Sequence, residues 1–238
     1  MSETIQLGEI AISVTRKDIK HVHLSVHPPS GRVTMAAPLA TRPEVARAYA
    51  VSKLGWIRDQ QAKLRGQPRE SLRQFVERES HHLWGRRYLL SVREAEAKPA
   101  IRFGHRNITL TVRPGSSRAK REAVVHEWHK SLLHDAVPKL IRRWEPKLGV
   151  EVAGYFLQRM KTKWGSCNHR ARTIRLNTEL AKKPRDLLEY VVVHEMLHLA
   201  APTHSEQFLT LMRRHYPSWR EARAELNELP LAAESWRL

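Results

Sequence analysis

The sequence predicts an α+β fold: a β-rich N-terminal half with one helix, followed by a mostly helical half with a small antiparallel sheet. Three observations lead to this fold class. Apolar and polar residues alternate over much of 10–36 and 80–112, which is the period of half-buried strands. Farther along the chain, apolar residues recur at helical spacing. Pro, Gly and two Ser at 114–117 separate these patterns, and we expect a soft domain boundary there, between 1–115 and 116–238.

The first strands are predicted at residues 10–15 and 21–27, where every second residue is aliphatic. Pro and Gly at 28–31 predict a turn, after which 33–36 returns as a strand. Three histidines fall on the polar face of the second strand. Two histidines in alternate positions can bind a metal, but solvent-facing side chains are the simpler interpretation. These residues are His21, His23 and His27.

A single helix is predicted over residues 41–66. Thr41 and Glu44 have the spacing of a capping box, and Pro43 suits the first helical turn. An apolar stripe at helical spacing runs through the segment, and its aromatic residues are expected in the core.

The remaining elements follow in order. Strands are predicted at 83–92, 100–103 and 108–112, with a hairpin turn between the last two. A long helix then begins near residue 117, since apolar residues recur in steps of four, and it ends before Gly149.

The composition narrows the class of protein. The 238 residues include 42 Lys and Arg against 24 Asp and Glu, a net charge of +18. A surface with this excess of positive charge attracts nucleic acid. The alternative is that the basic side chains only face solvent and keep the protein in solution. One cysteine excludes a disulfide-stapled secreted scaffold, and the N-terminus lacks the pattern of a signal peptide. The most apolar segment, 187–201, is too polar to span a membrane. We therefore expect a cytoplasmic protein with no membrane partner.

The segment 187–201 also contains a motif with chemical meaning. His194 and His198 are four residues apart, so on a helix both imidazoles can reach one metal ion. Glu195 can project beside that ion and accept a proton from water, which is the H-E-x-x-H arrangement of zinc peptidases. The alternative is a partly exposed helix with ordinary histidines. Three ionisable residues in an apolar helix are costly to bury, which favours the metal site.

A catalytic zinc site needs a third protein ligand. His204 is the first candidate, because Pro202 ends the helix and lets the chain turn back toward the metal. Thr203 and Glu206 have capping-box spacing, so His204 would lie in a turn where the next helix starts. The rival third ligands are His215, Glu221 and Glu225.

These residues resemble a known family. The pattern His194-Glu195-x-x-His198-Leu199-(x)4-His204-Ser205-(x)2-Phe208 is similar to the signature of the YgjP-like metallopeptidases, which are related to the SprT-like proteins. Three further family features occur in order. They are Lys161-Thr162-Lys163-Trp164-Gly165-Ser166-Cys167, Ile174-Arg175-Leu176-Asn177 and Pro217-x-Trp219. The resemblance is strongest over 152–229 and looser in the N-terminal half.

The resemblance implies a zincin-type metallopeptidase domain in the helical half, with Zn2+ as cofactor. It implies that His194, His198 and His204 bind the zinc and that Glu195 is the catalytic base. The expected function is a zinc metallopeptidase that hydrolyses peptide bonds in protein or peptide substrates through a zinc-bound water activated by Glu195. The SprT-like relatives include proteases that digest proteins crosslinked to DNA, so action near nucleic acid is a group-level analogy.

A predicted strand and the single cysteine lie close in sequence to the metal-binding segment. Alternation at 173–177 predicts a strand beside the metal helix, and we expect it to be an edge that aligns substrate backbone. Its residues are Thr173, Ile174, Arg175, Leu176 and Asn177. Cys167 could act as a zinc ligand or redox-sensitive group, but a small, half-buried residue that packs beside the helix is the preferred interpretation.

The stretch 152–178 contains no Asp or Glu but many basic residues. Candidate contacts to DNA, RNA or an acidic substrate are Arg159, Lys161, Lys163, Arg170 and Arg172. The alternative is that these side chains dock on acidic residues such as Glu179, Asp186 or Glu189. The alternative function is a nucleic-acid-binding protein with a structural zinc site and no peptidase activity. Glu195 would have no purpose in such a site, which favours catalysis.

Overall fold

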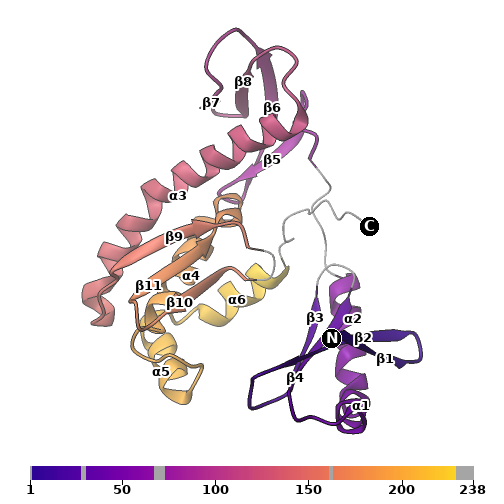
Figure 1. Cartoon of the computed structure of the whole chain (residues 1–238). Coiled ribbons are helices and arrows are strands. Elements are labelled where there is room, and N and C mark those ends of the chain that lie inside the picture. Colours follow the sequence, from indigo (N-terminus) through magenta and orange to yellow (C-terminus); the bar gives the residue numbers. More distant parts are fainter. Residues whose placement is uncertain (1, 28–30, 67–72, 161–162, 229–238) are drawn as a thin grey trace. The chain divides into compact units, whose positions relative to one another are not determined.

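The computed structural model describes residues 2–27, 31–66, 73–160 and 163–228 (Figure 1). The α+β class is confirmed, with six α-helices and three small sheets among these residues. Contacts divide the chain into two compact units, Met1–Pro68 and Arg69–Leu238. The boundary expected near residue 115 falls inside the second unit, between a strand and the long helix.

The first unit contains a four-stranded sheet in the order β1-β2-β4-β3. Its strands are β1 (Ser2–Leu7), β2 (Ile10–Lys17), β3 (His23–His27) and β4 (Arg32–Pro38). The outer pairs are antiparallel, but β2 and β4 are parallel. β4 runs opposite to β3, as in a simple meander, but it lies between β2 and β3 and therefore pairs in parallel with β2.

Two helices follow where one was predicted. α1 (Pro43–Ser52) and α2 (Leu54–Gly66) are separated at Lys53, whose backbone leaves the helical region (φ −102°, ψ 6°). The capping box expected at 41–44 does not form, because Arg42 is the cap residue and its side chain makes no capping hydrogen bond. Pro43 occupies the first turn, as predicted. Helix residues Ala46, Ala50 and Ile57 pack with Ile12, Val33 and Met35 of the sheet.

The second unit begins with a sheet of the same topology. Its strands are β5 (Ser80–Leu83), β6 (Arg86–Glu94), β7 (Ala100–Phe103) and β8 (Asn107–Val112), in the order β5-β6-β8-β7. Again the outer pairs are antiparallel and the central pair is parallel. The two sheets therefore share strand order and direction, and each is followed by a helix, although no repeat is evident in the sequence.

The β5–β6 turn ties this sheet to the elements around the site. Trp84 and Gly85 both have positive φ, and their N–H groups donate to the carbonyls of Ala181 and Lys182. Gly85 lies against Pro184 so closely that a Cβ would come within 2.8 Å of its ring. Glycine is required there by both its backbone angle and the space available.

Helix α3 (Arg118–Leu148) is shared by two cores (Figure 1). Near its start, Val125 packs with the β5–β8 sheet, whereas Leu133 and Val137 pack in the core around the site. Both ends of α3 lie where the sequence predicts them. The Ser117 hydroxyl accepts from the N–H of Lys120, and Gly149 takes the left-handed conformation (φ 64°) that ends a helix.

The third sheet is mixed, not antiparallel as predicted. β9 (Gly154–Gln158), β10 (Gly165–Asn168) and β11 (Thr173–Asn177) lie in the order β10-β11-β9. β10 and β11 form an antiparallel hairpin, and β9 pairs with the other side of β11 in parallel. The predicted strand at 173–177 is confirmed to the residue, but its predicted edge position is wrong because both its sides are paired.

Four helical segments complete the unit. They are the 3-10 helix η1 (Thr178–Lys182), α4 (Arg185–Leu197), α5 (Glu206–His215) and α6 (Trp219–Glu228). α4 is buried along most of its length at the centre of the largest core. The start of α5 is capped by the Ser205 hydroxyl and not by Thr203 as predicted. None of the described helices is long and apolar enough to cross a membrane.

Candidate metal centre

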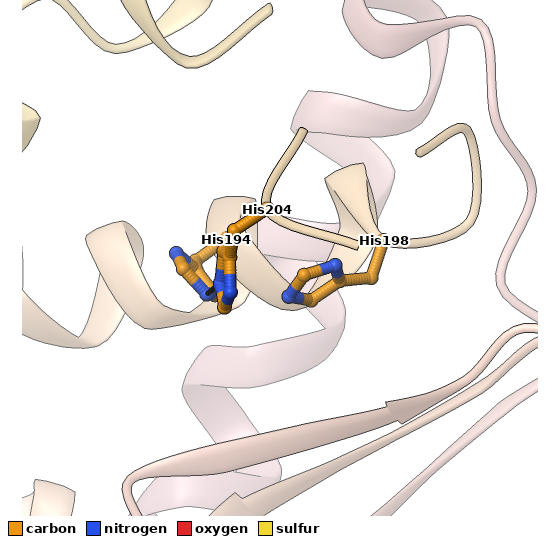
Figure 2. Close-up of side chains that lie close together, drawn as sticks. All are labelled: His194, His198 and His204. Atoms are coloured by element: carbon orange, nitrogen blue, oxygen red, sulfur yellow. Dashed lines mark hydrogen bonds between the residues drawn. The ribbon is translucent and has the colours of Figure 1, made fainter. Parts of the chain in front are cut away.

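Three imidazoles from one stretch of chain converge in the structure (Figure 2). His194 lies on α4, His198 is its C-terminal cap residue, and His204 lies in the turn before α5. One ring nitrogen of each lies within 4.8 Å of the others, and the Nε2 atoms of His194 and His204 are 3.1 Å apart. Among the described residues, no other group of three His, Cys, Asp or Glu side chains meets this geometry. The rival ligands His215, Glu221 and Glu225 are therefore not part of the cluster.

Local backbone structure orients these rings. His198 remains in the helical region (φ −65°, ψ −13°), so the one-turn relation between His194 and His198 is preserved beyond the last helical residue. Nδ1 of His198 lies 3.2 Å from the carbonyl oxygen of Ala201. When Nδ1 donates this bond, Nε2 keeps its lone pair for a cation.

Burial and the neighbouring rings favour the neutral form of His194 and His198. Burial lowers the pKa of His194 to about 3, and the nearby His198 and His204 act in the same direction. The pKa of His198 is also lowered, mainly by burial. Neutral imidazole is the form that binds metals, and a set of three imidazole nitrogens fits zinc well. The donor chemistry therefore fits the cofactor that the sequence predicts.

An aromatic ring supports all three histidines. The Phe208 ring is stacked on His198, with centroids 4.6 Å apart and planes inclined by 22°. It meets His194 and His204 edge-on at 5.0 and 4.9 Å. Phe208 is buried at the start of α5, so this helix positions both the ring and the preceding His204. The support by Phe208 was not predicted, although the residue belongs to the motif.

Glu195 lies beside this cluster with only 6% of its surface exposed. Burial raises the pKa of its carboxyl group to about 8, and the positive charge of Lys163 opposes the rise. Gly165 of β10 makes room for the carboxylate, because a Cβ at this position would lie 2.5 Å from Oε1 of Glu195. The carboxylate is thus held between the metal helix and the first strand residue of β10.

Two cavities open on either side of the cluster and share part of their walls. Both are lined by Lys163, Gly165, His194, Glu195 and His204. The first, here called the β10 cavity, has a volume of about 330 Å3 and extends over Ser166, Cys167, His169 and Pro202. The second, here called the α6 cavity, has a volume of about 420 Å3 and extends over Tyr190, Phe208, Trp219, Arg223, Leu226 and Asn227. The shared walls form one cleft past Glu195.

Contrary to the prediction, the strand at 173–177 does not line this cleft. Ile174, Leu176 and Asn177 are buried, and Arg175 lies over the ring of Phe156. β10 is the strand between β11 and the cleft, because its residues 165–167 line the β10 cavity. The prediction that Thr173–Asn177 is an edge that aligns substrate backbone is wrong, because β10 and β9 are paired with its two sides.

Asn177 has a different role. Its Oδ1 accepts from the N–H groups of Met160 (3.3 Å) and Glu179 (3.1 Å). Its Nδ2 donates to the carbonyl oxygens of Met160 (2.9 Å) and Lys163 (2.8 Å). Its own N–H donates to the carbonyl oxygen of Trp164. The side chain therefore fixes the backbone immediately before Gly165.

The basic side chains of 152–178 differ in their contacts and exposure. Arg159 pairs with Glu122 (3.1 Å) and Glu179 (3.7 Å), and Arg172 pairs with Glu151 (3.0 Å). These two side chains thus dock on acidic residues, as the alternative interpretation expected. Of the others, Lys163 lines the cleft, Arg170 is exposed, and Lys161 lies outside the described residues.

Cys167 lines the β10 cavity, but its thiol is not activated. Burial and the nearby Glu195 raise its pKa to about 11. Its Sγ does not belong to the cluster of ligand atoms. The structure therefore favours a small packing residue over a metal ligand.

Sequence reasoning also missed the cavity residues on α6. Trp219, Arg223 and Leu226 follow at helical spacing, which was a usable signal because it places them on one helix face.

Comparisons with known proteins come from a family model and from solved structures. The model described as "YgjP-like, metallopeptidase domain" matches residues 20–229. Crystal structures of two metallopeptidase zymogens, Pyrococcus abyssi abylysin and Methanocaldococcus jannaschii jannalysin, are each 21% identical and cover 38% of this chain. The alignments span 90% and 92% of those chains, with TM-scores of 0.36 and 0.34. No curated protein matches the chain.

Proposed function

The chain belongs to the YgjP-like metallopeptidase family, and on this premise we propose that it is a zinc-dependent peptidase whose general base is Glu195. The observation that carries the proposal is the convergence of three imidazoles with a buried carboxylate in one open cleft. His194, His198 and His204 would hold the zinc. When bound, zinc supplies Lewis-acid chemistry: it polarises a carbonyl group and lowers the pKa of water.

The chain's own residues account for the remaining steps. The carboxylate of Glu195 accepts a proton from the attacking water and delivers it to the leaving amine. Gly165 leaves the space that this carboxylate occupies, and the hydrogen bonds of Asn177 fix the strand that contains Gly165. Phe208 holds the three imidazole rings in place.

The substrate backbone has a candidate partner in β10. An extended peptide can add to a free strand edge through main-chain hydrogen bonds, and β10 is one of the two edge strands of its sheet. This strand lines the cleft beside the histidines, so a peptide paired with it would pass Glu195. β10 replaces the strand at 173–177 as the proposed aligning element.

Nucleic acid is not part of the proposed function. Arg159 and Arg172 pair with glutamates at the surface, so these two side chains have partners other than phosphate. Lys163 faces a cleft that also contains Glu195. A peptide with acidic residues is a simpler match to this local charge.

The test compares Glu195→Gln with Glu221→Gln, which removes an exposed carboxylate from α6. Both proteins are loaded with zinc, their metal content is measured, and hydrolysis of a peptide library is followed by mass spectrometry. We expect one zinc per chain in both variants, with turnover lost only in Glu195→Gln. Unchanged hydrolysis by pure, zinc-loaded Glu195→Gln would exclude the general-base role.

A further inference from the structure

The α6 cavity is lined by two cationic side chains, Lys163 and Arg223, beside the histidine cluster. On the basis of the peptidase function proposed above, we propose that it is a specificity pocket for a carboxylate of the substrate, beside the bond that is cut. The cavity shares Gly165, Glu195 and His204 with the rest of the cleft. A residue adjacent to a peptide bond held at Glu195 can therefore extend into it.

The inner wall of the cavity is apolar and rigid. Phe208, Trp219 and Leu226 are buried, and they line the cavity from α5 and α6. Tyr190 contributes its ring from α4. Such a wall suits the aliphatic stem of a side chain, because burying methylene groups is favourable. At about 420 Å3, the cavity is large enough for a side chain as long as glutamate.

The polar groups in this wall are mainly donors. Nε1 of Trp219 is buried and has no hydrogen-bond partner among the described residues. A buried N–H without an acceptor is unfavourable, so a small shift of the indole that brings Nε1 to an incoming carboxylate oxygen would be favourable. Trp219 is only 9% exposed, so water has little access to the indole.

The charges point to the same ligand. Among the described residues that line the cavity, the cations are Lys163 and Arg223, and the only acid is Glu195. No ion pair of Arg223 or Lys163 with another described residue is found. A guanidinium that lacks an internal partner can bind a carboxylate through two hydrogen bonds. Arg223 and Trp219 lie one helical turn apart on α6, so both can face one ligand.

A carboxylate at this place can come from a glutamate side chain or from the C-terminus of the substrate. The experiment uses three labelled peptides of one sequence, with Glu, with Gln in its place, and with Glu and an amidated C-terminus. Binding is measured by fluorescence anisotropy on zinc-loaded Glu195→Gln, and cleavage is measured on the otherwise unmodified protein. Binding is thus observed even where no bond is cut.

Three substitutions locate the effect. Arg223→Gln removes the cation, and Trp219→Phe removes the indole N–H but keeps an aromatic ring. Arg214→Gln is the matched control, since it removes the same charge from an exposed site on α5 outside the cavity. We expect the Glu peptide to bind at least about tenfold more tightly than the Gln peptide. This ratio should fall toward one in Arg223→Gln, fall partly in Trp219→Phe and stay unchanged in Arg214→Gln.

The outcomes separate the pocket from the peptidase reaction. Weaker binding of the amidated Glu peptide than of the free Glu peptide would assign the pocket to a chain-terminal carboxylate, and weaker binding of the Gln peptide would assign it to a side chain. Equal binding of all three peptides would overturn the pocket, even if all of them are cleaved. Selective binding without cleavage by the unmodified protein would leave the pocket standing and count against the peptidase function.

Discussion

The Cα atom of Gly165 lies against the side chain of Glu195: a Cβ built on Gly165 would be 2.5 Å from Oε1 and 2.7 Å from Cγ of the glutamate. Real Cβ atoms do not come this close to neighbouring atoms. Both partners are constrained, because Glu195 is on a buried helix and Gly165 begins a paired strand. Glycine at this position therefore determines where the carboxylate can lie.

Gly165→Ala should accordingly reduce catalysis without removing the metal site. The added methyl group must displace the Glu195 carboxylate, and a misplacement of about 1 Å in a catalytic group costs roughly 100-fold in rate. We expect kcat to fall by about this factor while zinc content stays at one per chain. Gly154→Ala is the control, because a Cβ there meets only Thr173 at an ordinary 3.9 Å. Full activity of Gly165→Ala would show that the proton acceptor is not held by this contact.

Asn177→Ala should destabilise the second unit. The side chain makes four hydrogen bonds to backbone groups, and its removal leaves the Lys163 and Met160 carbonyls without this donor. We expect the free energy of unfolding to fall by about 3 kcal/mol in urea titrations, since each unpaired buried group costs about 1–3 kcal/mol. Asn168→Ala, which removes one exposed hydrogen bond to Ala171, should cost much less. Equal effects of the two variants would contradict the organising role of Asn177.

His129 should make the protein less stable in mild acid. It is buried on α3, and burial lowers the pKa of its imidazole to about 3. An unfolded histidine titrates near 6.5, so between these values the unfolded chain binds more protons and the free energy of unfolding falls as the pH falls. The expected contribution is about 1.4 kcal/mol per pH unit.

The measurement compares the pH dependence of unfolding in wild type and His129→Leu, in the presence of a chelator that removes the effect of metal release. The variant should lose this part of the slope between pH 6 and 4, whatever its stability at pH 7. Parallel curves would mean that His129 titrates in the folded protein as it does in the unfolded chain.

The parts of the site that the sequence predicted depend on short-range geometry. His194 and His198 share a helix face because they are four residues apart, and Pro202 returns the chain so that His204 can join them. The strand at 173–177 and the helix end at Gly149 were likewise local signals.

The errors concern contacts between distant segments. Alternation marks Thr173–Asn177 as a strand, but nothing within it shows that Gly154–Gln158 would pair with its far side and bury it. The parallel central pairs of the two four-stranded sheets were missed for the same reason, because strand order depends on long-range pairing. The break at Lys53 was missed because its only local signal is Gly55, which lies two residues further on, inside α2. The need for glycine at position 165 comes from its contact with Glu195, which is thirty positions away in the sequence.

Phe208→Leu should weaken zinc binding without unfolding the protein. The aromatic ring contacts all three imidazoles, and leucine fills only part of its volume, so the histidine rings gain freedom that metal binding must then restrict. Groups that orient metal ligands typically contribute about 10- to 100-fold to affinity, and we expect the zinc Kd to rise by about tenfold. Competition with a chromophoric chelator measures this change. Phe156→Leu, at an exposed position on β9, should leave Kd unchanged.

His204→Ala should weaken zinc binding more than Phe208→Leu does, because it removes a ligand atom and not only the support of one. A Kd for His204→Ala equal to that of the unmodified protein would show that a different third ligand completes the site.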